Sequence, residues 1–295
     1  MFEEFSPAKL LGSRCHECEV FFDIESVFYC PQFTVKYRGV PGAGLHIAKN
    51  KFGDHTLLSW NWPTLARQWL PTIDHPSDKA TSEFLVTAPA KYQVVANGLL
   101  QEELDLGDGL GMTHWKRSVP IASWLNNIGA AQFAARHFGT AAGVALQTWA
   151  FPRDRDNGIF TFEEPTRQAI EFFTSHIGPY PYEKLADVQV AVMGGAMEHA
   201  SAIFFGERGV TNRPAFGLPA HEISHQWFGD SVTEKDWNDA WLSEGFATYF
   251  ASLASEFHAG PRCFCRRHAA FAHQHPRHGT FFFSALSSLF SASQR

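Results

Sequence analysis

The sequence predicts an α+β protein in which an N-terminal antiparallel β-sheet domain is followed by a mainly helical domain. Its 295 residues are enough for two domains that each bury a core of their own. Short alternating apolar runs, separated by Gly, Pro, Asn and Asp, fill residues 34–141, a pattern typical of antiparallel strands. Helical signals replace them after Val144. We therefore expect a β-domain over 34–141 and a helical domain over 142–258, with an unassigned segment at 1–33 and an atypical tail at 259–295.

Composition and charge narrow the classes of function. A hydrophobic share of 45% with 18% charged residues is typical of a globular protein rather than a disordered one. The net charge of −6 gives no electrostatic footprint for nucleic acid. No apolar run is long enough to span a bilayer, and the acidic start of the chain lacks the basic-then-apolar order of a secretion signal. We expect a cytoplasmic protein with no nucleic-acid partner and no membrane span.

The five cysteines leave two interpretations open. Cys15 and Cys18 form a C-x-x-C pair, and Cys263 and Cys265 form a second close pair. Two such pairs can make a zinc ribbon, but the second pair lacks the usual two-residue spacing. We favour free or incidental thiols, and the odd total argues against a disulfide scaffold.

In the first half, the runs 33–37, 83–87 and 92–97 are predicted strands because apolar and polar residues alternate in them. Tryptophan is frequent around them. Such rings can stack on carbohydrate, but packing in a core or at a domain interface is their commoner use and is the interpretation we favour. The tryptophans concerned are Trp60, Trp62, Trp69, Trp115 and Trp124.

In the second half, a helix is predicted over 165–176. Glu163, Glu164 and Pro165 are start signals, and Gly178 follows its end. The apolar run 188–193 is predicted to be a strand.

The most informative stretch is 218–230, in which His221, Glu222 and His225 form the pattern H-E-x-x-H. On a helix, histidines spaced by four residues lie one above the other on one face, where both imidazoles can bind one tetrahedral zinc ion. Glu222 can then reach a metal-bound water as a general base. A helix is plausible here because Pro219 suits a first turn and Gly229 a C-terminal cap.

A catalytic zinc also needs a third protein ligand, and Glu244 is the candidate. The residues between His225 and Glu244 allow a helix end, a loop and a return helix, for which Asp236, Asn238 and Asp239 are possible N-caps. Two histidines and two glutamates in these roles form a hydrolytic zinc set. The alternative is that the histidines are ordinary polar positions and Glu244 a solvated helix carboxylate.

With these motifs, the chain resembles the zinc aminopeptidases of the gluzincin group, which include aminopeptidase N and leukotriene hydrolase. The resemblance covers about residues 35–260. Four segments carry it in the family's order: 66–80 of the β-domain, 194–201 with a G-x-M-E-N-like signature, 221–230 and 241–250. It implies a β-saddle or sandwich followed by a thermolysin-like domain that binds one Zn²⁺ per chain. Against that family the chain is expected to be truncated at both ends.

The resemblance also implies roles for further residues. Glu198 is expected to bind the α-amine of the substrate, with Gly195, Ala196 and Met197 forming the rest of the substrate-binding signature. His199 stands where the family usually has Asn. By similarity with thermolysin-like sites, the strand 188–193 is expected at a sheet edge, where it binds the main chain of the substrate. Two hydroxyl residues, Ser243 and Thr248, are expected to hold the two zinc-binding histidines.

The functional prediction is a zinc metallopeptidase that removes N-terminal residues from peptides with a free N-terminal amine. Two alternatives stay open. The family uses a tyrosine as oxyanion donor, and the only tyrosine after Glu244 is Tyr249, which a helix turns away from the metal face. A zinc-binding or interaction protein without turnover is therefore the first alternative, and a zinc endopeptidase is the second.

Overall fold

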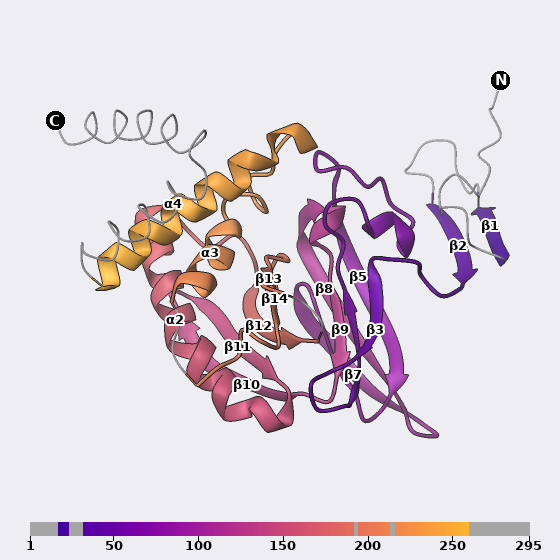
Figure 1. Ribbon diagram of the computed structural model, residues 1–295. Helices are drawn as coiled ribbons and strands as arrows, with labels where there is room; N and C mark the ends of the chain where they lie inside the picture. The colour runs from indigo at the N-terminus through magenta and orange to yellow at the C-terminus, as the bar shows by residue number, and fades with distance from the viewer. Residues whose placement is uncertain (1–16, 24–31, 192–193, 213–215, 260–295) are drawn as a thin grey trace.

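The computed structural model describes residues 17–23, 32–191, 194–212 and 216–259, with side chains from residue 34 onward. Figure 1 shows strands in the first half of the chain and helices gathered beside a second sheet in the other half. The predicted succession of an antiparallel β-sheet domain and a helix-bearing domain is confirmed. Among the described residues no helix is both long enough and apolar enough to cross a bilayer.

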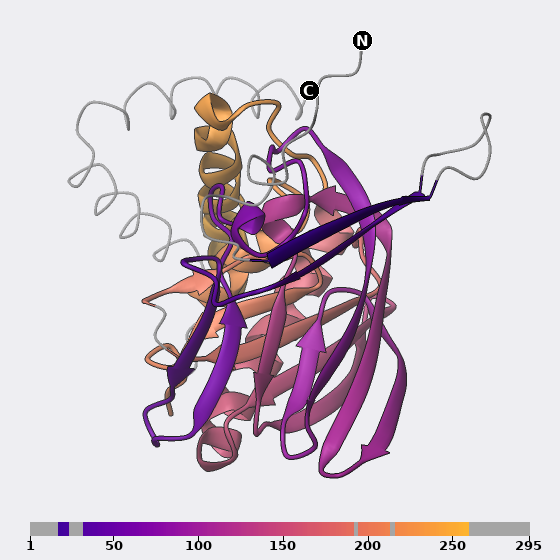
Figure 2. The same cartoon turned by 90° about the vertical axis from the view of Figure 1, so that its right-hand side faces the viewer.

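The first half of the chain is built from antiparallel strands. A four-stranded sheet has the order β3-β4-β9-β6, a three-stranded sheet has the order β5-β8-β7, and β1 pairs with β2. The three runs predicted as strands, 33–37, 83–87 and 92–97, coincide with β2, β5 and β6. The strands are β1 (Glu17–Asp23), β2 (Gln32–Arg38), β3 (Leu45–Lys49), β4 (His55–Ser59), β5 (Lys79–Pro89), β6 (Gln93–Ala96), β7 (Leu99–Gly107), β8 (Leu110–Ala122) and β9 (Ile128–Ala131). Figure 2 shows the long strands β5, β7 and β8 from the side.

The second half contains a five-stranded mixed sheet with the order β10-β11-β12-β14-β13. Its strands are β10 (Ala134–Ala141), β11 (Val144–Ala150), β12 (Lys184–Val190), β13 (Ala196–Met197) and β14 (Ala202–Gly206). β11, β12 and β14 run parallel, and β13 adds antiparallel to β14 at the edge. Residues 134–141 belong to this second sheet, whereas the prediction placed them in the β-domain that ends at residue 141. The reason is the tight turn at Ala142 and Gly143, where φ is positive and β10 folds back on β11 as a hairpin.

The prediction of an edge strand at 188–193 is wrong. β12 has a parallel neighbour on each side, and all seven of its residues are buried. A strand that is covered on both faces has no regular alternation of apolar and polar residues. The pattern of residues 188–193 therefore indicated a strand but did not tell whether that strand lies inside the sheet or at its edge. The edge strands of this sheet are β10 and β13, and β13 is only two residues long.

The α-helices of the described residues are α2 (Arg155–His176), α3 (Gly217–His225) and α4 (Ala240–Ala259). Helices α2 and α3 pack on strands of the second sheet, and α4 packs on α3 and α2. The predicted helix end at His176 is confirmed, but the predicted start near Pro165 is wrong, because α2 begins at Arg155 and Pro165 lies inside it. Packing of the first turns on β11 overrides the proline signal. An added Cβ at Gly158 would lie 2.6 Å from the Ala150 Cβ, so this glycine lets helix and strand approach closely.

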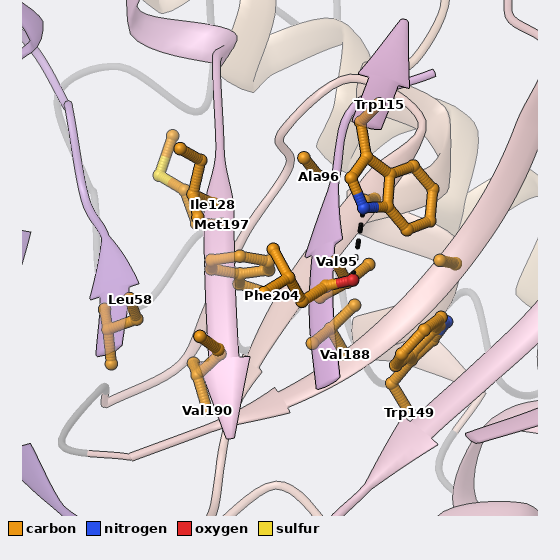
Figure 3. Close-up of a cluster of buried hydrophobic side chains, with 14 of the residues drawn as sticks. Leu58, Val95, Ala96, Trp115, Ile128, Trp149, Val188, Val190, Met197 and Phe204 are labelled. Carbon is orange, nitrogen blue, oxygen red and sulfur yellow. Dashed lines mark hydrogen bonds between the residues drawn. The ribbon is translucent and has the colours of Figure 1, made fainter. Parts of the chain in front are cut away.

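The main core lies between the β-domain and the second sheet. Figure 3 shows Trp115, Val95, Val188 and Phe204 from the two parts of the chain packed together. Large buried side chains of this kind contribute about 1.5–3 kcal/mol each to folding. Trp69, Trp115 and Trp124 are buried and Trp60 and Trp62 pack against them, so the packing interpretation of the tryptophans is confirmed.

Candidate metal centre and active site

Helix α3 carries the H-E-x-x-H residues. Pro219 lies in its first turn, as predicted, and the four-residue spacing brings the Nε2 atoms of His221 and His225 to 3.2 Å from each other. The helix ends at His225, so the prediction that Gly229 caps it is wrong. Gly229 instead has φ of 118° in the following turn, where an added Cβ would lie 2.2 Å from the Ser243 Oγ.

Helix α4 returns Glu244 to the two histidines. The side chain of Asp236 accepts a hydrogen bond from the Asn238 backbone N–H and starts the short 3₁₀ turn η4 (Trp237–Asp239) that leads into α4. Glu244 Oε2 then lies 3.4 Å from His221 Nε2 and 3.6 Å from His225 Nε2. Three residues from two helices therefore converge on one point, and the imidazoles hold the pKa of Glu244 well below its ordinary value.

Contacts on the far side of the His225 ring fix its orientation. The Nδ1 atom lies 3.1 Å from the Phe228 carbonyl oxygen and 3.2 Å from the Ser243 Oγ. A carbonyl oxygen only accepts, so Nδ1–H is the donor, and in the neutral ring Nε2 keeps its lone pair for a ligand. Ser243 thus lies at the predicted place. Thr248 does not: in the described part of the chain its hydroxyl has no hydrogen bond to either imidazole, and its carbonyl accepts from the Ser252 hydroxyl.

Two further carboxylates face the same centre. The ligand atoms of Glu198, Glu222 and His225 all lie within 4.8 Å of one another, and these three side chains are buried. Burial, followed by the neighbouring charge of Glu198, raises the pKa of Glu222 to about 8. Burial also raises the pKa of Glu198. A positive charge between these groups would favour their ionised forms.

The other three residues of the predicted substrate-binding signature differ in how far they are exposed. Gly195 is exposed, has φ of 102°, and its carbonyl accepts from the Gly206 N–H at 2.8 Å. Ala196 is partly buried in β13. The Met197 side chain is directed into the core near Ile128, as Figure 3 shows, so only its backbone is available to a substrate.

His199, the departure from the usual signature, is fully buried beside Phe204 with a ring separation of 4.9 Å. Among the described residues neither of its ring nitrogens has a hydrogen-bond partner. Burial lowers its pKa to about 3, so this ring is neutral at ordinary pH.

The three converging ligand atoms fit a tetrahedral zinc ion. Zinc takes histidine nitrogen and carboxylate oxygen, and bonds of about 2.0–2.1 Å at tetrahedral angles place such atoms roughly 3.3 Å apart. The observed separations of 3.2, 3.4 and 3.6 Å lie around this value. The Glu244 side chain is 54% exposed, so solvent reaches the ligand set from one side.

Several polar residues around the centre were not among the predicted ones. The buried Gln226 bonds to the backbone of Glu198, and its place directly after His225 was the one available signal. Lys79 donates to the carbonyl oxygens of Asp230 and Ser231 at 3.2 and 2.9 Å. Asn97 of the β-domain donates to the Ala200 carbonyl at 2.7 Å. Lys79 lies in the segment 66–80 that carries part of the family resemblance, but neither its contacts nor that of Asn97 could be predicted, because they join segments distant in the sequence. The predicted cysteine sites lie outside the residues whose side chains the structure describes.

Comparison with known proteins matches both halves of the chain to one family. The Peptidase M1 N-terminal domain matches residues 54–125, and the Peptidase family M1 domain matches residues 160–277. The second match continues past residue 258, at which the predicted domain ends.

Relatives and solved structures agree with this match. Aminopeptidase A of Gloydius brevicauda is 29% identical over 200 residues, and endoplasmic reticulum aminopeptidase 1 of Homo sapiens is 29% identical over 203 residues. These alignments cover 64% and 63% of this chain but 21% of each relative. An M1 zinc metallopeptidase from Deinococcus radiodurans superposes with a TM-score of 0.69 at 27% identity, over 83% of this chain and 56% of that one. With both domain types present in order on the matching fold, the chain belongs to peptidase family M1.

Proposed function

We propose that this protein is a zinc-dependent aminopeptidase that removes N-terminal residues from peptides. One observation carries the proposal: the ligand atoms of His221, His225 and Glu244 converge, while carboxylate oxygens of Glu198 and Glu222 lie within 4.8 Å of a ring nitrogen of His225. The similarity to aminopeptidases at 29% identity supports it.

In this proposal His221, His225 and Glu244 hold one zinc ion per chain. A zinc ion held by them would act as a Lewis acid, which polarises the carbonyl of the scissile bond and lowers the pKa of bound water. Ser243 and the Phe228 carbonyl keep His225 in the tautomer that binds through Nε2.

Glu222 acts as the general base and then as the acid. Its carboxylate takes a proton from the attacking water and returns the proton to the leaving amine. Burial and the charge of Glu198 raise its pKa to about 8, and the positive charge of the metal opposes this rise, which keeps the carboxylate able to accept a proton near neutral pH.

Glu198 selects the end of the chain. A buried carboxylate binds an ammonium through charge-assisted hydrogen bonds, and its short distance from the metal ligands leaves only the first peptide bond within reach of them. The crystal structure of a variant of a two-domain M1 zinc metallopeptidase, 26% identical to this chain, was determined with L-arginine bound. A free amino acid carries the α-ammonium that Glu198 would bind, which supports this role.

The test compares hydrolysis of an amino-acid anilide with a free amine and its N-acetylated form, before and after removal of metal by a chelator. We expect hydrolysis of the free-amine substrate alone, loss with the chelator and recovery with zinc. Glu222→Gln should lower kcat by at least about a hundredfold, the usual contribution of a general base. Glu171→Gln, the same change at an exposed position of α2, is the matched control and should leave kcat unchanged.

The two alternative functions give different results in the same assay. An endopeptidase would cleave the N-acetylated substrate as well as the free one. A zinc-binding protein without turnover would bind about one zinc per chain and hydrolyse neither. Either result would replace the proposed function.

A further inference from the structure

Gln226 joins the metal-binding helix to the segment that carries Glu198. Its side-chain amide is fully buried and uses every hydrogen-bonding position that it has. The Nε2 atom donates to the Glu198 carbonyl oxygen at 2.8 Å and to the Asp230 Oδ2 at 2.9 Å. The Oε1 atom accepts from the Ser201 backbone N–H and from the Tyr180 hydroxyl, both at 2.9 Å. Since a carbonyl only accepts and a backbone N–H only donates, these partners fix which end of the amide is which.

The segment Glu198–Ser201, called here the amine loop, depends on such contacts for its shape. Ser201 has φ of 65°, a left-handed conformation that non-glycine residues rarely adopt and that persists only where its surroundings hold it. Asn97 holds the Ala200 carbonyl, and Lys184 donates to the Ser201 carbonyl at 3.1 Å. Gln226 is the side chain that contacts both ends of the loop, at the Glu198 carbonyl and at the Ser201 N–H.

The position of Gln226 in the chain gives these contacts a functional meaning. It directly follows His225 and forms the C-cap of α3, so its backbone moves with a metal ligand. Its side chain therefore sets the distance between the amine loop and the metal-binding residues. A residue that served only to fill the core would have no need to bind both ends of one short loop.

We infer that Gln226 is a positioning residue that fixes the Glu198 carboxylate relative to the metal-binding histidines and so sets the selectivity for a free α-amine. The inference rests on the proposed function, because it assigns Gln226 to the amine-binding step. Gln226 does not touch the substrate itself, and its effect is transmitted through the backbone of Glu198.

The experiment measures binding rather than turnover. The zinc-loaded full chain is titrated by calorimetry with leucine hydroxamate and with the analogue that lacks the amine, and the ratio of the two Kd values gives the amine selectivity. Gln226→Met keeps the length of the side chain but removes all four hydrogen bonds. Gln226→Asn keeps the amide but shortens its reach. Tyr180→Phe is the matched control, since it removes one hydrogen bond to the same Oε1 atom and none to the amine loop. Zinc content and thermal unfolding are recorded for each variant.

We expect Gln226→Met to lower the amine selectivity about tenfold. This is the effect of losing one hydrogen bond to a charged group, here the bond between the displaced Glu198 carboxylate and the ammonium of the ligand. Its zinc content and its affinity for the analogue without the amine should stay close to those of the wild type. Tyr180→Phe should keep the full selectivity even where its Tm falls. If Gln226→Met does not fold, Gln226→Asn takes its place in the same comparison.

Two results would overturn the inference. One is an unchanged selectivity in a folded Gln226 variant, and the other is an equal loss of affinity for both compounds, which would indicate general loosening of the site. A wild type that binds both compounds equally well would instead refute the proposed function, and the inference with it. The cases are distinguishable because the last appears in the wild type and the others only in the variants.

Discussion

Replacement of Gly229 by alanine should disturb the metal centre without touching a metal ligand. An added Cβ would lie 2.2 Å from the Ser243 Oγ and 3.2 Å from the His225 Nδ1. The first contact is too short to persist, so Ser243 must move away from the ring that it helps to hold. In addition, φ at this position is 118°, which alanine adopts only under strain.

Both effects have known sizes. A strained backbone conformation costs about 1–3 kcal/mol, and overpacking a filled site adds about 1–3 kcal/mol. The free energy of unfolding of Gly229→Ala should therefore fall by at least about 2 kcal/mol. Loss of a hydrogen-bond partner behind a metal-binding histidine typically weakens metal binding about 10–100-fold, and we expect an effect of this size on the zinc affinity.

The assay is a double-mutant cycle with Ser243→Ala. The serine variant should lose zinc affinity with a smaller loss of stability, because its Cβ stays in place. In the double variant the 2.2 Å contact is gone, and the nearest remaining atoms are the His225 Nδ1 at 3.2 Å and the Ser243 Cβ at 3.3 Å. Its loss of stability should therefore be smaller than the sum of the single losses. Denaturant unfolding and zinc competition with a chromophoric chelator give the two readings. Additive losses of stability, or a Gly229→Ala variant that binds zinc as the wild type does, would refute the reasoning.

Three further outcomes are expected. Glu244→Gln should greatly weaken zinc binding while leaving the apo chain folded, since this side chain is 54% exposed; unchanged zinc affinity in competition titrations would remove Glu244 from the ligand set. Burial lowers the pKa of Lys184 to about 7 from 10.5, so between pH 7 and 10 the unfolded chain binds a proton that the folded chain lacks and stability rises with pH. Unfolding in urea at pH 7, 8 and 9 should show a slope up to about 1.4 kcal/mol per pH unit steeper for the wild type than for Lys184→Met, and equal slopes would contradict the assignment. Gly158→Ala should lower the free energy of unfolding by about 1–3 kcal/mol because its Cβ would lie 2.6 Å from that of Ala150, whereas Gly42→Ala, with nothing within 4 Å, should change it little.

The parts of the site that lie on single helices were predictable from the sequence. The spacing of His221 and His225 fixes which face of α3 they share, because helical geometry is local. The capping residue Asp236 likewise predicted the start of the helical segment that carries Glu244. The roles of these residues in catalysis stay predictions until activity is measured.

The parts that depend on neighbours distant in the sequence were not predictable. Whether β12 lies inside the sheet depends on β14, which follows it in the chain and carries no signal of where it will pair. Helix α2 continues through Pro165 because β11 supports its first turns, which outweighs the local preference of proline. Met197 belongs to a substrate-binding signature, yet its side chain fills the core, since alternate residues of a strand face opposite sides.

The contacts of Lys79 and Asn97 have a consequence for protein engineering. Both residues belong to the β-domain, and both hold backbone carbonyls next to the metal centre, at Asp230, Ser231 and Ala200. A chimaera that replaces the N-terminal half with one lacking these two residues would therefore lose the hydrogen bonds that hold the backbone beside the metal centre, even with every catalytic side chain retained. Domain exchange in this architecture has to carry the lysine and the asparagine along as part of the graft.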